Sequence, residues 1–202
     1  MNFFNYESGF MKFVTLLSRI TVLNILWLCC CIPVITAGAS TYAQYYSTKC
    51  LLNGDIHVFQ NFKEGLRLEW KRATGTWVVL AVFCILFFID YSLITANDLP
   101  YESALVVVSV LAFITLVMIM LWLFPVMINF KGTTKELLFN SFVFTFMYAP
   151  LTLIAIAFYA IALYLFLRFY LLRPLIILFG QGLIVYGILN LFDKAFAKYR
   201  TE

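Results

Sequence analysis

Long runs without a formally charged residue dominate the hydrophobic pattern of this chain. Five of them, residues 20–48, 73–89, 103–130, 137–167 and 174–192, contain no Asp, Glu, Lys or Arg. A helix needs about 20 mostly apolar residues to cross a bilayer. No run alternates with the period of two that a membrane barrel strand shows. The pattern therefore predicts an all-α, polytopic bundle of transmembrane helices with five spans.

The first run is too long for one span, and it contains residues that interrupt a helix. Pro33 removes a backbone donor and Gly38 loosens the chain, so we expect a helix break at Pro33, Thr36 and Gly38. Pro150 divides the fourth run in the same way. The predicted spans of a single transmembrane domain, residues 1–202, are 13–35, 73–95, 103–128, 149–170 and 174–193, and shorter helices at the cytoplasmic membrane surface are predicted at 39–52, 57–72 and 135–148.

The segment 57–72 has the clearest helical periodicity outside the spans. Five apolar residues recur at helical spacing and predict one face, while polar residues form the other. Such a helix is typical of the headgroup region of a bilayer. It would act as an elbow leading into the second span and, as a compatible second role, as a docking surface. The apolar face is Phe59, Phe62, Leu66, Trp70 and Ala73, and the candidate partner-binding residues are Phe59, Phe62, Lys63, Glu64, Arg67 and Trp70.

Composition supports a membrane protein. Apolar side chains make up 64% of the residues and charged ones 12%, whereas soluble domains carry about 45–50% and about 25%. So few charges cannot cover the surface of a soluble globule of 202 residues. This argues against a soluble enzyme, a nucleic-acid binder and a disordered chain. The lipid bilayer is therefore the first expected partner, and no nucleic acid is expected.

The basic residues predict how the chain is oriented, because cytoplasmic connections are enriched in Lys and Arg. Ten basic residues fall on one side of the predicted topology and four on the other, and the connection 97–102 carries only acids. The N-terminus is therefore predicted outside and the C-terminus in the cytoplasm. Residues 37–39 resemble a signal-peptide cleavage site, but the apolar run before them is too long and lacks a basic start, so cleavage is not expected. The ten are Lys49, Lys63, Arg67, Lys71, Arg72, Lys131, Lys135, Lys194, Lys198 and Arg200, and the four are Lys12, Arg19, Arg168 and Arg173.

Polar chemistry inside the predicted spans is sparse. Asp90 is the one ionisable candidate there, and its position near the outer end of its helix favours an interfacial acid over an ion-coupling group. Asn24, Gln181 and Asn190 are expected to make hydrogen bonds between helices. Residues 29–31 are consecutive cysteines, which point in different directions on a helix and so cannot converge on one metal.

No constellation of catalytic residues is recognisable. The single histidine, His57, lies at a loop-to-helix junction without a second ligand nearby. The motifs of intramembrane proteases, phosphate loops and dinucleotide-binding turns do not occur in the sequence. We therefore expect no enzyme activity, no catalytic residue, no metal site and no cofactor.

The first third of the chain is similar to a known family. Residues 23–28 read Leu-Asn-Ile-Leu-Trp-Leu and residues 32–41 read Ile-Pro-Val-Ile-Thr-Ala-Gly-Ala-Ser-Thr. Both stretches resemble the signature of the YesL-like family, small bacterial membrane proteins whose function is largely unassigned. Phe59 with the following Phe62-Lys63-Glu64 resembles the next block of that family.

The specific motifs of this resemblance cover residues 23–72, and residues 179–180, Phe-Gly, are a weaker match. Cys31-Ile32 departs from the Leu or Ser that usually precedes the family's proline. The resemblance implies a place in the bacterial cytoplasmic (plasma) membrane. Members of the family are commonly encoded beside carbohydrate ABC importers and two-component regulators, and the family has no established catalytic residues to transfer.

These observations lead to a hypothesis of association rather than chemistry. We expect an accessory or regulatory membrane subunit associated with a bacterial carbohydrate ABC importer, with permease subunits or another membrane protein as its partner. A membrane signalling partner of a two-component histidine kinase is the alternative. An autonomous small-molecule carrier and a purely structural bundle remain further alternatives.

Overall fold

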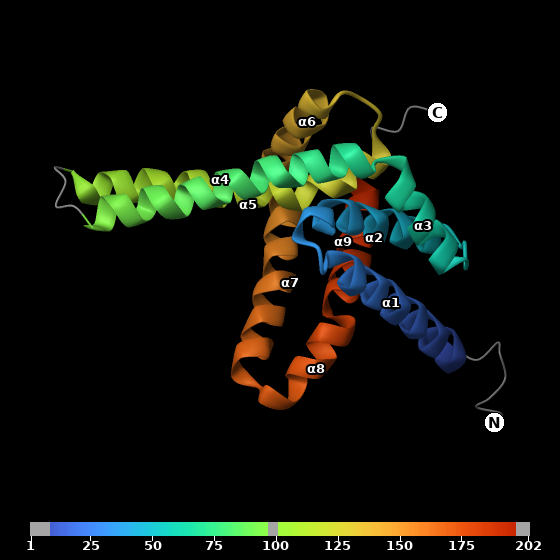
Figure 1. The fold of residues 1–202 in the computed structure, drawn as a ribbon. Coiled ribbons are helices and arrows are strands. Elements are labelled where there is room, and N and C mark those ends of the chain that lie inside the picture. The colour runs from blue at the N-terminus through green and yellow to red at the C-terminus, as the bar shows by residue number, and fades with distance from the viewer. Residues whose placement is uncertain (1–8, 97–100, 197–202) are drawn as a thin grey trace.

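Helices form nearly the whole of the computed structural model, which describes residues 9–96 and 101–196 (Figure 1). Five helical rods are long and apolar enough to cross a membrane: α1, α4, α5, α7 and a fifth rod, Tyr170–Asp193, that runs through α8 into α9. The prediction of an all-α bundle with five spans is thus confirmed, and the part of the chain that the structure describes contains no strand. The helices are α1 Gly9–Cys31, α2 Ala37–Leu52, α3 Val58–Leu68, α4 Trp70–Ala96, α5 Glu102–Asn129, α6 Thr134–Met147, α7 Ala149–Arg168, α8 Arg173–Leu175 and α9 Gln181–Phe196.

The short helix α2 lies at the centre of the molecule. It packs against α1, α3, α4, α5 and α9, and most of its residues are buried. Its small polar side chains fit there because they bond to neighbouring backbones: the Ser40 hydroxyl donates to the Trp27 carbonyl (3.0 Å) and the Ser47 hydroxyl to the Val58 carbonyl (3.1 Å). The sequence suggested a surface helix here. Its depth relative to a bilayer stays a prediction, but within the protein α2 belongs to the core.

Two helical hairpins leave this centre in different directions. In Figure 1 the α4–α5 hairpin extends to the left, and α7 runs downward and returns through α8 and α9. The buried residues of α5 are confined to its last turns near α2, Trp122–Met127. The outer parts of α4 and α5 pack mainly on each other and leave apolar side chains exposed, as helices that face lipid do.

An aromatic cluster joins the inner ends of the hairpins. Trp122 is fully buried, and its ring stacks on Phe192 with a centroid distance of 3.8 Å and on Phe144 at 5.6 Å. Its indole Nε1 donates to the Thr152 hydroxyl over 2.9 Å. The buried indole thus has both its packing and its hydrogen-bond requirement met, and α5, α6, α7 and α9 are held together at one point.

Two predicted helix boundaries are wrong. The first helix ends at Cys31 rather than near residue 35, since a proline cannot donate a backbone hydrogen bond and disfavours helical geometry in the residue before it, here Ile32. The predicted helix 57–72 divides at Glu69, whose backbone leaves the helical region (φ −130°, ψ 21°). Trp70 therefore begins α4 instead of ending the surface helix.

The fourth apolar run divides next to Pro150. Helix α6 ends at Met147 and α7 begins at Ala149, with the proline in its first turn, where the absence of a backbone donor costs nothing. The start of α6 is fixed by a capping box, in which Thr133 and Glu136 each bond the other's backbone.

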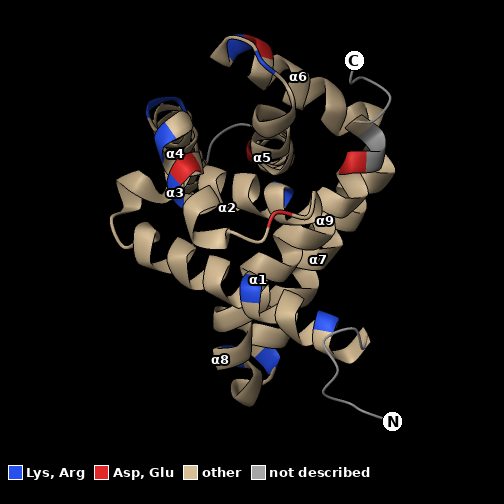
Figure 2. Cartoon of the chain, turned by 90° about the vertical axis from the view of Figure 1, so that its right-hand side faces the viewer, with Lys and Arg blue, Asp and Glu red and all other residues tan. Residues whose placement is uncertain are grey.

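Charged side chains are concentrated at a few places on the chain. Figure 2 shows basic residues around α3 and the start of α4, at the start of α6, on α1 and around α8, with long uncharged stretches between them. The predicted orientation stays a prediction. Residues 97–100, Lys198 and Arg200 lie outside the described residues, as does the side chain of Lys194.

Candidate functional site

The helix α3 is held against α2 by a very close contact. Its buried residues are Val58, Asn61, Phe62 and Gly65. A Cβ atom at Gly65 would lie 2.9 Å from the Cα atom of Ala43, so a larger residue would push the two helices apart. This contact fixes which face of α3 is turned outward.

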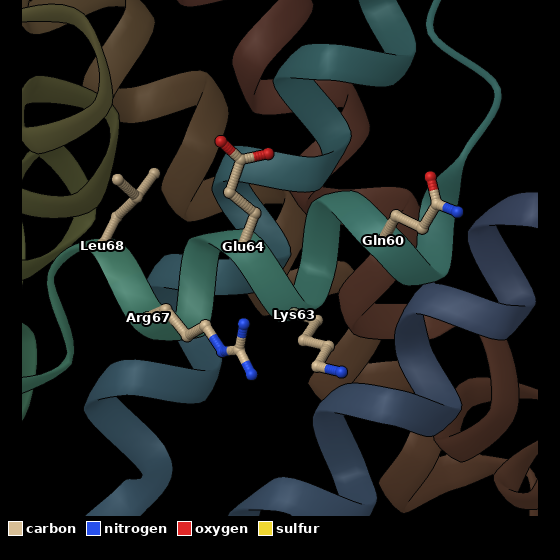
Figure 3. Close-up of a pocket in the computed structure, with 5 residues that line it drawn as sticks. All are labelled: Gln60, Lys63, Glu64, Arg67 and Leu68. Carbon is tan, nitrogen blue, oxygen red and sulfur yellow. The ribbon is translucent and has the colours of Figure 1, made fainter.

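The outward face of α3 carries charges of both signs. Gln60, Lys63, Glu64, Arg67 and Leu68 border an open groove of about 450 Å³. In Figure 3 Lys63 and Arg67 point to one side of the helix, and Gln60, Glu64 and Leu68 to the other. Lys63 and Arg67 lie four residues apart, so their like charges are neighbours on the helix surface. The face thus presents a basic edge beside an acidic one.

Two exposed aromatic residues lie near the two ends of α3, Phe59 in its first turn and Trp70 as the first residue of α4. Phe59 is 63% exposed and Trp70 is 52% exposed. The ammonium group of Lys71 lies 6.0 Å from the centre of the Trp70 ring. We name the set Phe59, Lys63, Glu64, Arg67, Leu68 and Trp70 the α3 surface.

The sequence placed Phe59, Phe62 and Trp70 on one apolar face, and the structure corrects this. Phe62 is buried against the core at 3% exposure, whereas Phe59 and Trp70 are exposed. The apolar spacing predicts the wrong buried face because Asn61 and Gly65, which are not apolar side chains, lie on the face that is buried. In addition, the break at Glu69 moves Trp70 onto the next helix. The predicted candidates Lys63, Glu64 and Arg67 do lie together on the outer face.

The connection into α4 is tied to the rest of the protein by Arg72. Its Nε atom lies 3.2 Å from a carboxylate oxygen of Glu69, and its guanidinium donates to the Gly132 carbonyl over 3.0 Å. The α3–α4 corner is therefore connected to the loop between α5 and α6.

The turn after α1 contains the predicted helix break. Pro33 precedes a single 3₁₀ turn, Val34–Thr36, and the Thr36 hydroxyl donates to the carbonyls of Cys30 (2.6 Å) and Pro33 (2.8 Å). Thr36 thereby satisfies a backbone acceptor that the end of α1 leaves open.

The predicted role of Gly38 as a breaker is wrong. Gly38 lies inside α2, where a Cβ atom would come within 2.4 Å of the Trp77 Cβ atom and 2.6 Å of the Ala73 carbonyl oxygen. Its function is to let α2 approach α4 closely. The indole of Trp77 also donates to the Val34 carbonyl over 3.1 Å, so the turn is fastened to α4.

Asn24 makes the most extensive polar contact in the interior. Its fully buried side chain donates to the carbonyls of Ile177 (2.7 Å) and Leu178 (3.0 Å) and accepts from the Gly182 backbone N–H (2.9 Å). Ile177 and Leu178 belong to a π-helical turn, Ile176–Gly180, whose irregular hydrogen bonding leaves backbone groups in need of partners. Asn24 thus fastens α1 to the fifth rod.

A second polar contact joins α2 to α7 and the fifth rod. The Gln181 amide donates to the Tyr159 hydroxyl over 3.3 Å, which in turn bonds to the hydroxyl of Tyr45. Burial raises the pKa of Tyr45 well above its ordinary value, with the nearby Tyr159 adding to the effect. Such a phenol stays protonated at physiological pH, so it bonds neighbours rather than acting as a base.

The sequence analysis expects three polar side chains to bond between helices and Asp90 to be an acid at the membrane interface. Asn24 and Gln181 do make hydrogen bonds between helices, but Asn190 is exposed on α9. Asp90 is exposed on α4 and accepts a hydrogen bond from the Ser109 hydroxyl over 2.7 Å. Lys49 of α2 forms an ion pair with Asp193 of α9, a contact that the sequence analysis did not anticipate because nothing local in the sequence marks it.

Comparison with known proteins gives a partial match. A family model described as "Protein of unknown function, DUF624" matches residues 20–91. The matched segment begins inside α1 and ends inside α4, and so contains the Pro33 turn, α2 and α3. No curated protein and no solved structure matches the chain significantly. The fold and this match together describe a helical, multi-pass type of membrane protein that is similar over this segment to a family of unknown function.

Proposed function

We propose that this protein is an accessory or regulatory membrane subunit associated with a bacterial carbohydrate ABC importer, and that the α3 surface is its contact with the permease. The resemblance to the YesL-like family supplies the importer context. The match to a family of unknown function over residues 20–91 covers the α3 surface but does not identify a partner.

The observation that carries the proposal is the composition of the α3 surface. Elsewhere the exposed residues of the long helices are overwhelmingly apolar, as contact with lipid requires. The α3 surface instead combines exposed Phe59 and Trp70 with Lys63, Glu64 and Arg67. Aromatic residues and arginine are the side chains most enriched at the energetic centres of protein interfaces.

The rigid attachment of α3 supports the same role. The helix is fixed against α2 at Gly65 and its far end is fixed through Arg72. A surface that is already ordered binds with a smaller loss of conformational entropy than a flexible one. The α3 surface therefore has both the side chains and the rigidity of a docking element.

The test is co-purification from the native host. A C-terminally tagged chain is extracted at native expression in mild detergent, and the proteins recovered with it are quantified by mass spectrometry. We expect stoichiometric recovery of permease subunits with the unaltered chain. Lys63→Glu combined with Arg67→Glu, and Phe59→Ala combined with Trp70→Ala, should each reduce that recovery at least about tenfold, since loss of interface anchors costs about 2 kcal/mol or more.

A matched control is available on α6. Phe139 is 66% exposed, similar to Phe59, and Phe139→Ala should leave permease recovery unchanged. Absence of permease from the unaltered sample, or equal recovery with all variants, would contradict the proposal. Recovery of a histidine kinase instead would favour the signalling role, and solute flux by the purified chain in proteoliposomes would favour the carrier.

A further inference from the structure

The two hairpins carry opposite charges at their outer ends. Residues 73–130, which cover the α4–α5 hairpin beyond the first three residues of α4, contain acidic residues but no Lys or Arg. Residues 149–180, which include α7 and the start of the fifth rod, contain Arg168 and Arg173 but no acid. The outer part of each hairpin therefore has no residue of opposite charge that could neutralise its own charge.

Asp90 is the acidic residue set among lipid-facing side chains on α4. Its carboxylate accepts a hydrogen bond from Ser109, and both residues line a groove of about 310 Å³ between α4 and α5. The floor of that groove includes Phe87 and Phe113, whose rings stack at 4.3 Å. Asp90 is exposed beside this groove, so its carboxylate can accept a charge-assisted hydrogen bond from a cationic side chain of another molecule.

Arg168 is the corresponding basic residue. It is the last residue of α7 and is exposed. The neighbouring Arg173 is already engaged, because its Nε atom donates to the Phe166 carbonyl over 2.9 Å and its guanidinium lies 5.0 Å from the centre of the Tyr170 ring. For Arg168 the described part of the chain offers no ion pair.

Asp90 and Arg168 lie at similar distances along their helices from the first residue of each helix. At a rise of 1.5 Å per residue, Asp90 is about 30 Å along α4 from Trp70, and Arg168 is about 29 Å along α7 from Ala149. Helix α4 begins beside α2 and α7 begins beside the Trp122 cluster, yet within one copy their outer ends point in different directions (Figure 1). The two side chains therefore do not meet within the molecule, and in the topology predicted from the basic residues both lie towards the outer side of the membrane.

We propose that a second copy of this chain supplies the missing partner. The outer end of α7 from one copy lies in the α4–α5 groove of the other, so that Arg168 pairs with Asp90. A two-fold axis makes the contact reciprocal, with two such pairs in each dimer. This interface is separate from the α3 surface and does not depend on the proposed link to an importer.

The reciprocal geometry allows a decisive test by charge exchange. Two copies with different tags are co-expressed, extracted in mild detergent and captured through one tag, and the recovery of the other is measured. The unaltered chain should capture itself. Asp90→Arg should fail to capture Asp90→Arg, and Arg168→Asp should fail to capture Arg168→Asp, each by at least about tenfold, because both contacts then oppose like charges.

The mixed pair separates contact between copies from contact within one copy. When Asp90→Arg is co-expressed with Arg168→Asp, one of the two contacts has its charges exchanged and the other is unaltered. Capture should therefore return to within about twofold of the level of the unaltered chain. The single variants, by contrast, should lose at least about tenfold, which corresponds to about 1.4 kcal/mol. A chain carrying both substitutions should capture itself but not the unaltered chain. Lys12→Asp, which changes a charge on α1, should have little effect.

Three results would overturn the proposal. The first is an unaltered chain that does not capture itself, and the second is a mixed pair that is recovered as poorly as the single variants. The third is a doubly substituted chain that captures the unaltered one normally. Thermal midpoints of the purified variants verify that each has folded, and recovery of the mixed pair is itself evidence that both single variants are folded.

Discussion

Replacing Asn24 by alanine is the most direct test of how the core is held together. The substitution removes three hydrogen bonds to backbone groups of the fifth rod. Side-chain hydrogen bonds in membrane proteins contribute about 0.6 kcal/mol on average and up to about 1.7 kcal/mol. Because the freed backbone groups stay buried without partners, which adds a desolvation cost of about 1–3 kcal/mol, we expect Asn24→Ala to lower the free energy of unfolding by roughly 2–4 kcal/mol.

The assay is equilibrium unfolding by SDS in mixed micelles, followed by circular dichroism. Asn190→Ala is the matched control, since it removes the same amide from an exposed position on α9 and should change the unfolding free energy by less than about 0.5 kcal/mol. Asn24→Asp should destabilise at least as much as Asn24→Ala, because a carboxylate cannot donate to the two carbonyls. Equal effects of the substitutions at Asn24 and Asn190 would refute the claim that Asn24 fastens the π-helical turn.

Three further outcomes follow from the same structure. Gly38→Ala should lower the free energy of unfolding by about 1–3 kcal/mol, because the added methyl group overpacks against α4. Gly75→Ala places its methyl group in open space and should raise the free energy of unfolding by up to about 1 kcal/mol. The thermal midpoints of the two variants test this difference. Trp122→Phe, which keeps the ring stack but removes the indole donor, should cost about 1–2 kcal/mol in the SDS assay. The backbone N–H of His57, with the side chains of Asn61 and His57, holds the pKa of Asp55 below its usual value. The hydrogen bond that protects the His57 amide from hydrogen exchange should therefore be fully present above about pH 4 and be lost as the pH falls through the lower pKa of Asp55 in the folded state. In Asp55→Ala the protection of this amide should no longer change over that pH range.

The spans were predictable because apolar length alone decides them. A run of about 20 uncharged residues has few alternatives to a helix in lipid. The turn at Pro33 was predictable for a similar reason, since the missing backbone donor acts locally whatever surrounds it. Lys63 and Arg67 could be placed together because residues four apart are neighbours on a helix surface, and Glu64 could be placed beside Arg67 because residues three apart are neighbours too.

The burial of α2 and the inner face of α3 could not be read from the sequence. Both depend on very close helix contacts at Gly38 and Gly65, and a glycine has the same local signature whether it breaks a helix or admits a neighbour. The partner of Asn24 was hidden for another reason. The asparagine was expected to bond between helices, but its acceptors are carbonyls freed by a π-helical turn more than 150 residues away in the chain, and no residue type marks such a turn.

The two proposed interfaces can be separated because they lie at opposite ends of α4. Trp70 and Asp90 are about 30 Å apart along that helix, far beyond the distance at which substitutions usually affect each other. Changes on the α3 surface should therefore reduce permease recovery and leave self-capture intact, while Asp90→Arg should do the reverse. If Asp90→Arg also removed the permease, the importer contact would require a dimer, and the mixed pair of Asp90→Arg with Arg168→Asp should then restore both.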